Sequence, residues 1–367
     1  MGHTRPKLCL RRCGRQYRLS SSGQDTNSYS REWGFAGAWL DGEYEWKGYI
    51  LHDELPSQLN PNDGYIVTAN NAIIDSSYPY VITIDWDPGY RADRIVTMIE
   101  EDSVISMADM QLMQADTKSS WVALVLPYLT ELESDDPNLN EGLELLDNWD
   151  GSMVRDSSAA ALVQAMRRYM VSLTFEDELG ISLMNYAPNT STNVFERELP
   201  NANSPWFDNI HTPEIETRDV ILLQALQAAI EELSFSLGDE MSNWRWGDLH
   251  TATFANQSLG LSGIGLVESI FNRRPFAANG SNDTVNSTAY NIREPYEVYT
   301  IPAYRQIIDL NQFDQSVSIH APGQSGHPYH PHYDDLIDSW LNDEYHTMLW
   351  EPDDIENSYQ DKLVLHP

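Results

Sequence analysis

Two consecutive asparagines after a short apolar run constrain this chain more than any other feature. The segment NPNDGYIVTANN spans Asn60–Asn71, and its residues Tyr65–Val67 predict a β-strand that delivers Asn70 and Asn71 to a loop. A side-chain amide at a strand end is a neutral donor on rigid backbone, and such a donor stabilises an oxyanion without supplying a proton. A simple turn is the alternative interpretation, because Asn tolerates left-handed backbone geometry.

Helical and strand patterns alternate after this loop. Apolar spacing predicts helices at Arg91–Glu101, Ser119–Glu133, Ser157–Leu173 and Thr217–Leu233, and a closing helix within Leu336–Trp350. Strand patterns return at Glu297–Ile301 and Gln306–Leu310, while the polar composition of Asn279–Asn286 predicts an exposed loop. The mixture predicts an α+β fold.

A series of motifs accompanies the asparagine loop in a fixed order. They are GEYEWKGYILHDELP at Gly42–Pro56, NPNDGYIVTANN, YRADRI at Tyr90–Ile95, LLDNWDG at Leu145–Gly151, SPWFDNIHTPEIETRD at Ser204–Asp219, NWRWGDLHTATF at Asn243–Phe254, YRQIIDL at Tyr304–Leu310 and GQSGHPYHPHYDD at Gly323–Asp335. From Trp39 onward, the chain resembles the C-terminal part of the penicillin amidase (penicillin acylase) family. Members of that family are N-terminal-nucleophile hydrolases that cleave linear amides.

The resemblance carries expectations about the fold and the domains. It implies part of a four-layer α/β/β/α sandwich, interrupted by a helix-rich lobe at approximately residues 90–275. Residues 36–367 would be the C-terminal part of the family's β-chain. Residues 1–35 match nothing in the pattern, and we expect them to form a disordered leader.

The resemblance also implies a mechanism. A serine at the start of a self-cleaved chain attacks the amide carbon, and its own α-amino group takes the proton, since the pKa of such a group is near neutrality. An acyl-enzyme forms and is hydrolysed. Matching strand to strand places the oxyanion donor on Asn70 rather than Asn71, and places the arginine that organises the site on Arg94.

The nucleophile is expected outside this chain. In the family pattern it lies much further upstream than the 69 residues that precede Asn70. Gly280-Ser281 and Ser242 resemble self-cleavage junctions, but a cut at either would separate the serine from most of the chain that should surround it. We therefore expect a missing upstream segment, with the nucleophile and the α-chain, as a partner. A catalytically inert fragment is the alternative.

A histidine cluster suggests a rival enzyme class. His327, His330, His332, Asp334 and Asp335 have a spacing that could bind zinc, so a metal-dependent hydrolase is an alternative function. The resemblance instead makes these residues structural. It implies no cofactor in this chain, and calcium only in the complete enzyme, because most ligands lie upstream.

Charge separates the leader from the rest of the chain. The chain has 22 basic and 56 acidic residues; seven basic and two acidic residues lie in the first 32, which leaves 15 and 54 for the remainder. This negative charge argues against nucleic acid as a partner, because nucleic-acid binding needs a basic surface. Such a surface, with only four lysines, resembles proteins of salt-in halophiles, particularly haloarchaea. An acidic secreted enzyme is the alternative.

The leader lacks the signals that would place it in a membrane. It has no apolar core of signal-peptide length and no membrane span. A basic interaction arm is an alternative to disorder. Cys9 and Cys13 have no further ligands nearby, so they do not predict a zinc site. The resemblance implies an extracytoplasmic location.

Overall fold

The computed structural model describes residues 18–20, 48–83, 85–184, 188–292, 294–359 and 362–366. The chain divides into two units, residues 1–105 and residues 106–367. Most of the expected leader lies outside the described residues. Its described part is the short strand β1 (Arg18–Ser20), which pairs antiparallel with β2 (Ser57–Leu59).

The first unit is mainly loop, followed by one helix. Apart from β1 and β2, its described residues contain a 3₁₀ turn at His52–Glu54 and helix α1 (Tyr90–Glu101). The helix predicted from Arg91 is therefore confirmed. The strand predicted at Tyr65–Val67 is wrong, since only Val67 makes an isolated bridge. An apolar run becomes a strand only where a neighbouring strand satisfies its backbone groups, and this segment has no such ladder.

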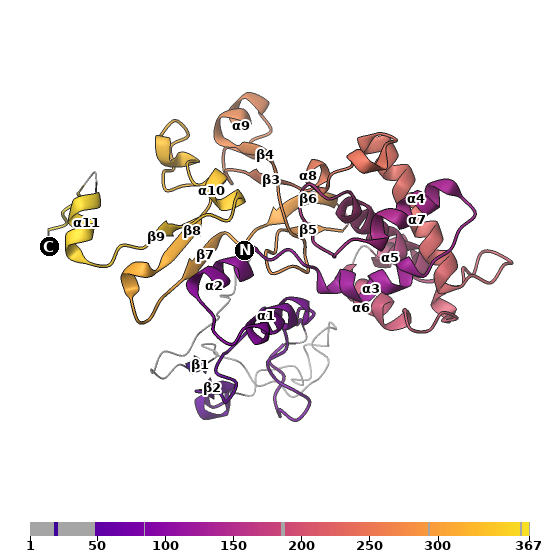
Figure 1. The fold of residues 1–367 in the computed structure, drawn as a ribbon, viewed down its shortest axis with the longest axis horizontal. Coiled ribbons are helices and arrows are strands. Elements are labelled where there is room, and N and C mark those ends of the chain that lie inside the picture. The colour runs from indigo at the N-terminus through magenta and orange to yellow at the C-terminus, as the bar shows by residue number, and fades with distance from the viewer. Residues whose placement is uncertain are drawn as a thin grey trace, which may run out of the picture. The chain divides into compact units, whose positions relative to one another are not determined.

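The second unit contains most of the helices. They are α2 (Met107–Ala115), α3 (Ser120–Thr130), α4 (Pro137–Asp147), α5 (Ser158–Met184), α6 (Pro188–Glu198), α7 (Arg218–Leu237), α8 (Trp246–Leu249), α9 (Gly265–Phe271), α10 (Ile337–Leu341) and α11 (Pro352–Ser358). Helices α3 to α7 gather into one group (Figure 1). The closing helix expected within Leu336–Trp350 shrinks to the five residues of α10, because Asn342 and Asp343 end it and Asp343 takes a left-handed backbone (φ 58°).

The apolar stripe of α7 forms the core of this helical group. Leu222, Leu226 and Leu233 are fully buried, as the sequence predicts. Gly142 of α4 approaches closely, since a Cβ there would lie 3.0 Å from Ile230 Cδ1. By length and composition alone α7 could cross a membrane, but its stripe packs against protein.

Two small sheets complete the second unit. The first has the order β4 (Arg273–Ala277), β3 (Thr251–Phe254), β6 (Glu294–Thr300), β5 (Ala289–Asn291), in which β3 and β6 run parallel. The second has the antiparallel order β7 (Tyr304–Ile307), β8 (Val317–His320), β9 (His346–Thr347). Helices and sheets together confirm the predicted α+β class.

The segment Asn279–Asn286 is buried, so the predicted exposed loop is wrong. Ser281 and Thr284 are completely inaccessible, and Asp283 forms an ion pair with Arg167 of α5. Gly280 is required at its position, because φ is 95° and a Cβ would lie 2.1 Å from the carbonyl oxygen of Asn286. Some polar groups of this loop bond to each other, as Thr284 Oγ1 accepts from the N–H of Ser281. Most bond to other elements, as Asn286 Oδ1 accepts from Arg305.

His250 is a structural histidine of the first sheet. It is fully buried, its ring stacks on Trp246 with 4.4 Å between centroids, and Nδ1 lies 2.8 Å from the carbonyl oxygen of Tyr296. Nε2 lies 3.0 Å from Thr288 Oγ1. Burial lowers the pKa of His250 to about 4, so the ring is neutral near pH 7. His250 is therefore a hydrogen-bonded structural residue.

The lowered pKa of His250 predicts a loss of stability in mild acid. The pKa of His250 is about 4 in the folded chain and 6.5 in the unfolded chain. Between these two pH values the residue is protonated only when the chain is unfolded. The free energy of unfolding should therefore fall by about 1.4 kcal/mol for each pH unit below 6.5. Urea unfolding of the parent and of His250→Asn at pH 7.5 and pH 5 measures this term. An identical pH slope in both proteins would contradict it.

Candidate active site

The candidate site is built around the loop that contains Asn70. This residue follows the buried Ala69 and takes a left-handed backbone, with φ at 68°. Asn is one of the residues that tolerates this conformation. Its carbonyl oxygen accepts a 3.0 Å hydrogen bond from the backbone N–H of Asp87. The loop is thereby joined to the segment that leads into α1.

The two asparagines use their side chains differently. Asn71 Oδ1 accepts from the N–H of Ala69 at 3.0 Å, and Asn71 Nδ2 donates to the carbonyl oxygen of Ala72 at 3.1 Å. Both polar atoms of Asn71 are therefore occupied within the loop. Asn70 Oδ1 accepts from Arg91, whereas Asn70 Nδ2 has no hydrogen-bond partner within the part of the chain that the structure describes. The Nδ2 amide of Asn70 is therefore available to donate a hydrogen bond to a ligand.

Arg91 holds the side chain of Asn70 from the first turn of α1. Its guanidinium is buried, and Nη2 lies 2.9 Å from Asn70 Oδ1, 2.8 Å from the carbonyl oxygen of Ala69 and 2.5 Å from Asp87 Oδ2. A guanidinium only donates hydrogen bonds, so the atom that faces it must be the amide oxygen of Asn70. The amide nitrogen is consequently directed away from Arg91.

A second contact joins the base of the loop to the other end of α1. The Tyr65 hydroxyl donates to Glu100 Oε1 at 2.6 Å, and this hydrogen bond raises the pKa of Tyr65 to about 12. The segment from Tyr65 to Asn70 is therefore attached near both ends of the helix, which limits its movement relative to α1.

The arginine in contact with Asn70 differs from the one that the family pattern indicates. Arg94 lies three positions later on the same helix, is half-buried and has an interaction of its own. Arg91 lies in the motif YRADRI, but the family pattern does not single it out. Arg91 could have been identified from its spacing to Asp87, because residues of opposite charge four positions apart often form an ion pair near the start of a helix.

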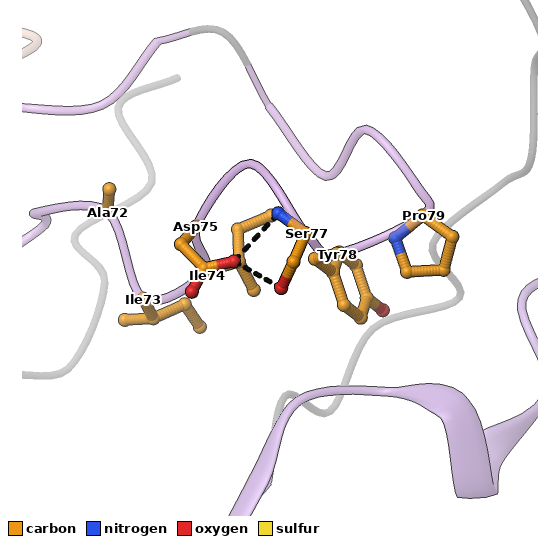
Figure 2. A pocket seen from close by; sticks show the side chains of 7 residues that line it. All are labelled: Ala72, Ile73, Ile74, Asp75, Ser77, Tyr78 and Pro79. Carbon is orange, nitrogen blue, oxygen red and sulfur yellow. Dashed lines mark hydrogen bonds between the residues drawn. The ribbon is translucent and has the colours of Figure 1, made fainter.

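A shallow open hollow follows the asparagines directly in sequence. It is lined by Ala72, Ile73, Ile74, Asp75, Ser77, Tyr78 and Pro79 (Figure 2). Asp75 closes its turn by accepting from both the N–H and the hydroxyl of Ser77, at 2.8 and 2.5 Å. Tyr78 donates to the carbonyl oxygen of Glu54 at 2.9 Å. This surface is preformed and partly apolar.

The histidine cluster does not form a metal site. His330 Nδ1 accepts from the N–H of His332, His332 Nδ1 lies 2.7 Å from Asp335 Oδ2, and Asp334 pairs with Arg273. Across the described ranges, no group of three or more His, Cys, Asp or Glu residues is placed to hold a metal ion. The described residues of the cluster therefore do not fit the zinc alternative.

Comparison with known proteins gives a consistent result. A family model described as penicillin amidase matches residues 28–357. The chain is 30% identical over 361 positions to the acyl-homoserine lactone acylase QuiP of Pseudomonas aeruginosa, which covers 89% of this chain and 42% of the relative. It is 27% identical over 328 positions to the penicillin acylase 2 proenzyme of Pseudomonas sp. strain SE83, covering 86% of this chain and 40% of that protein.

A solved structure supports the fold. The thermostable penicillin G acylase from Alcaligenes faecalis superposes with a TM-score of 0.55 at 20% identity, over 89% of this chain and 61% of that one. This likeness extends to the fold alone. The chain therefore spans 42% of the length of the first relative and shares its architecture with a larger enzyme.

Proposed function

This chain belongs to the penicillin amidase family, and from that premise we propose that it contributes to the hydrolysis of linear amides through an acyl-enzyme. Asn70 is the side-chain donor to the oxyanion, and the nucleophilic serine comes from a segment outside this chain. The observation that carries the proposal is the Asn70 amide, whose oxygen is fixed by Arg91 while its nitrogen keeps no partner among the described residues.

The chemistry of amide hydrolysis explains why this arrangement suits the role. Attack on the amide carbon converts a neutral carbonyl oxygen into an oxyanion, and donors fixed beforehand stabilise that charge without reorganisation. Asn70 is such a donor, because its amide is neutral at every working pH. Arg94, on the same helix, is assigned to organise the site, as the family pattern implies.

The names of the relatives support the proposed substrate class. Two of them are named for N-acyl-homoserine lactones and for penicillin, both of which are amides of a carboxylic acid with a small amine. We assign this chain the same general class, with the acyl group left among phenylacetyl, aliphatic and lactone-derived amides. Most of the residues that select the acyl group are assigned to the segment outside this chain.

The test is a complementation assay. The chain is produced alone and together with the upstream part encoded by its own locus or by the Pseudomonas aeruginosa relative. Each preparation then receives a phenylacetyl amide, an aliphatic amide and an N-acyl-homoserine lactone, and the released amine is measured. Amine release that requires both parts supports the proposal. An equal absence of release from all preparations supports the inert-fragment alternative.

The acidic surface leads to a separate proposal about the working environment. The net charge of −34 opposes folding in dilute buffer through self-repulsion. In molar KCl the screening length falls to about 3 Å, which removes most of that repulsion. We expect the free energy of unfolding to rise between low salt and molar KCl, as measured by denaturant titration. A fall in stability on adding salt would refute the halophilic assignment.

A further inference from the structure

The orientation of the Asn70 amide depends on one buried charge. Three acceptors converge on Arg91 Nη2, namely Asn70 Oδ1, the carbonyl oxygen of Ala69 and Asp87 Oδ2, all within 2.9 Å. This nitrogen carries only a pair of hydrogens, so at least one of them is shared. Without the guanidinium, the amide of Asn70 could turn over and offer its oxygen where the donor should be.

Asp87 completes the arrangement with both its backbone and its side chain. Its N–H donates to the carbonyl oxygen of Asn70 at 3.0 Å, and its carboxylate pairs with Arg91 at 2.5 Å. The Arg91 side chain is 8% exposed, whereas that of Asp87 is 51% exposed. A buried guanidinium needs an anionic partner, and Asp87 supplies it from the solvent side. One short stretch of chain thus fixes Asn70 at its backbone and at its side chain.

The charge of Arg91 also affects the strength of the donor. A cation at the amide oxygen draws electron density from the nitrogen, which makes the N–H groups better donors. The same contact prevents rotation of the amide, so no free energy is spent on orienting it during the reaction. The stronger donor and its fixed orientation both stabilise an oxyanion, whereas they change the binding of a neutral substrate little.

We propose that Asp87 and Arg91 form a positioning pair that sets the orientation and donor strength of the Asn70 amide. The pair touches neither substrate nor nucleophile and acts through Asn70 alone. This inference rests on the proposed function, in which Asn70 Nδ2 faces the oxyanion. It assigns to Arg91 a role that the family pattern does not give it.

The first test is spectroscopic and uses the chain by itself. The full chain is labelled with ¹⁵N-asparagine, and the Asn70 side-chain resonances are identified as the pair lost in Asn70→Ala. Arg91→Met, which keeps an apolar stem but no donor, should move this pair upfield and speed its hydrogen exchange. Arg91→Lys should give a smaller change, because a point charge replaces the planar fork.

Controls keep this test specific. Asp87→Asn leaves the guanidinium in place but weakens its anchor, so we expect a smaller shift in the same direction. The matched control is the exposed pair of Arg245 and Asp156, whose side chains are 59% and 70% exposed. Arg245→Met and Asp156→Asn should leave the Asn70 resonances unchanged. Unchanged chemical shifts and hydrogen exchange of the Asn70 side chain in Arg91→Met would overturn the proposal.

The second test is kinetic and uses the complemented enzyme. Arg91→Met should lower kcat with a smaller change in KM, by no more than the about 10²–10³-fold that the loss of one oxyanion donor costs. In the Asn70→Ala background it should lower kcat no further, since both changes remove the same interaction. Arg91→Lys should restore part of kcat.

The outcomes separate this inference from the proposed function. If Asn70→Ala abolishes activity while Arg91→Met keeps the parental kcat, the positioning pair is refuted and the proposed function stands. If Asn70→Ala keeps parental activity, the proposed role of Asn70 fails, whatever the resonances do. Additive losses in the double variant would show that Arg91 acts independently of Asn70, which also overturns the inference.

Discussion

We expect Asn70→Ala to lower kcat of the complemented enzyme by about 10²–10³-fold, the typical effect of removing one oxyanion donor. The affinity for the neutral substrate should change little, because in the proposed role the amide nitrogen contacts a charge that appears only in the transition state. Steady-state rates of amine release, measured across a range of substrate concentrations, separate kcat from KM.

Asn71→Ala is the matched comparison for this prediction. Both atoms of the Asn71 amide are occupied by Ala69 and Ala72 within the loop, so this change removes a loop contact and no free donor. We expect a smaller fall in kcat than for Asn70→Ala. A larger loss in Asn71→Ala would move the oxyanion donor to the second asparagine.

We expect Asp283→Ala to destabilise the second unit by about 3–5 kcal/mol, which is typical of removing one partner from a buried ion pair. The side chains of Asp283 and Arg167 are both 8% exposed, and the guanidinium of Arg167 also lies 4.2 Å from the ring centroid of Trp121. Removal of the carboxylate leaves a buried positive charge without compensation and releases the loop that begins at Asn279. Urea unfolding of the purified chain measures the loss.

The exposed pair of Asp156 and Arg245 provides the control for this effect. Its atoms lie 2.9 Å apart in well-solvated positions, so Asp156→Ala should cost only about 0–1 kcal/mol. Equal losses from Asp283→Ala and Asp156→Ala would show that the Arg167 pair is not buried in solution.

The helices could be predicted well where the pattern is local. The stripe of Leu222, Leu226 and Leu233 repeats at helical spacing, and all three residues are buried in α7. Ser157 opens the helix predicted at Ser157–Leu173, and its hydroxyl caps α5 by accepting from the N–H of Ala160 at 3.1 Å. These features depend only on neighbours within a few residues.

The predictions that failed depend on distant partners. Asn279–Asn286 has the composition of an exposed loop, but the partner of Asp283 lies 116 positions earlier in the sequence. The run Tyr65–Val67 has the composition of a strand, but a strand also needs a neighbour to pair with. Composition gives the local preference of a segment. The structure of these two segments depends instead on contacts with residues far away in the sequence.

The site was predictable only in part. The Asn–Asn pair marks the loop, and the family pattern selects Asn70. The contact from Arg91 depends on the path of the chain between Asn71 and Gly89, which places Asp87 beside the carbonyl oxygen of Asn70. Arg91 and Arg94 both lie on α1, and only coordinates distinguish which of the two meets the amide of Asn70.

The most direct test of the central claim is a crystal structure of the complemented enzyme with a boronic acid bound to its nucleophile. The boronate places an anionic oxygen where the oxyanion forms. We predict a distance of about 2.7–3.1 Å between that oxygen and Asn70 Nδ2, with Arg91 still bonded to Asn70 Oδ1. An Asn70 amide that faces solvent, while other donors hold the boronate, would contradict the account.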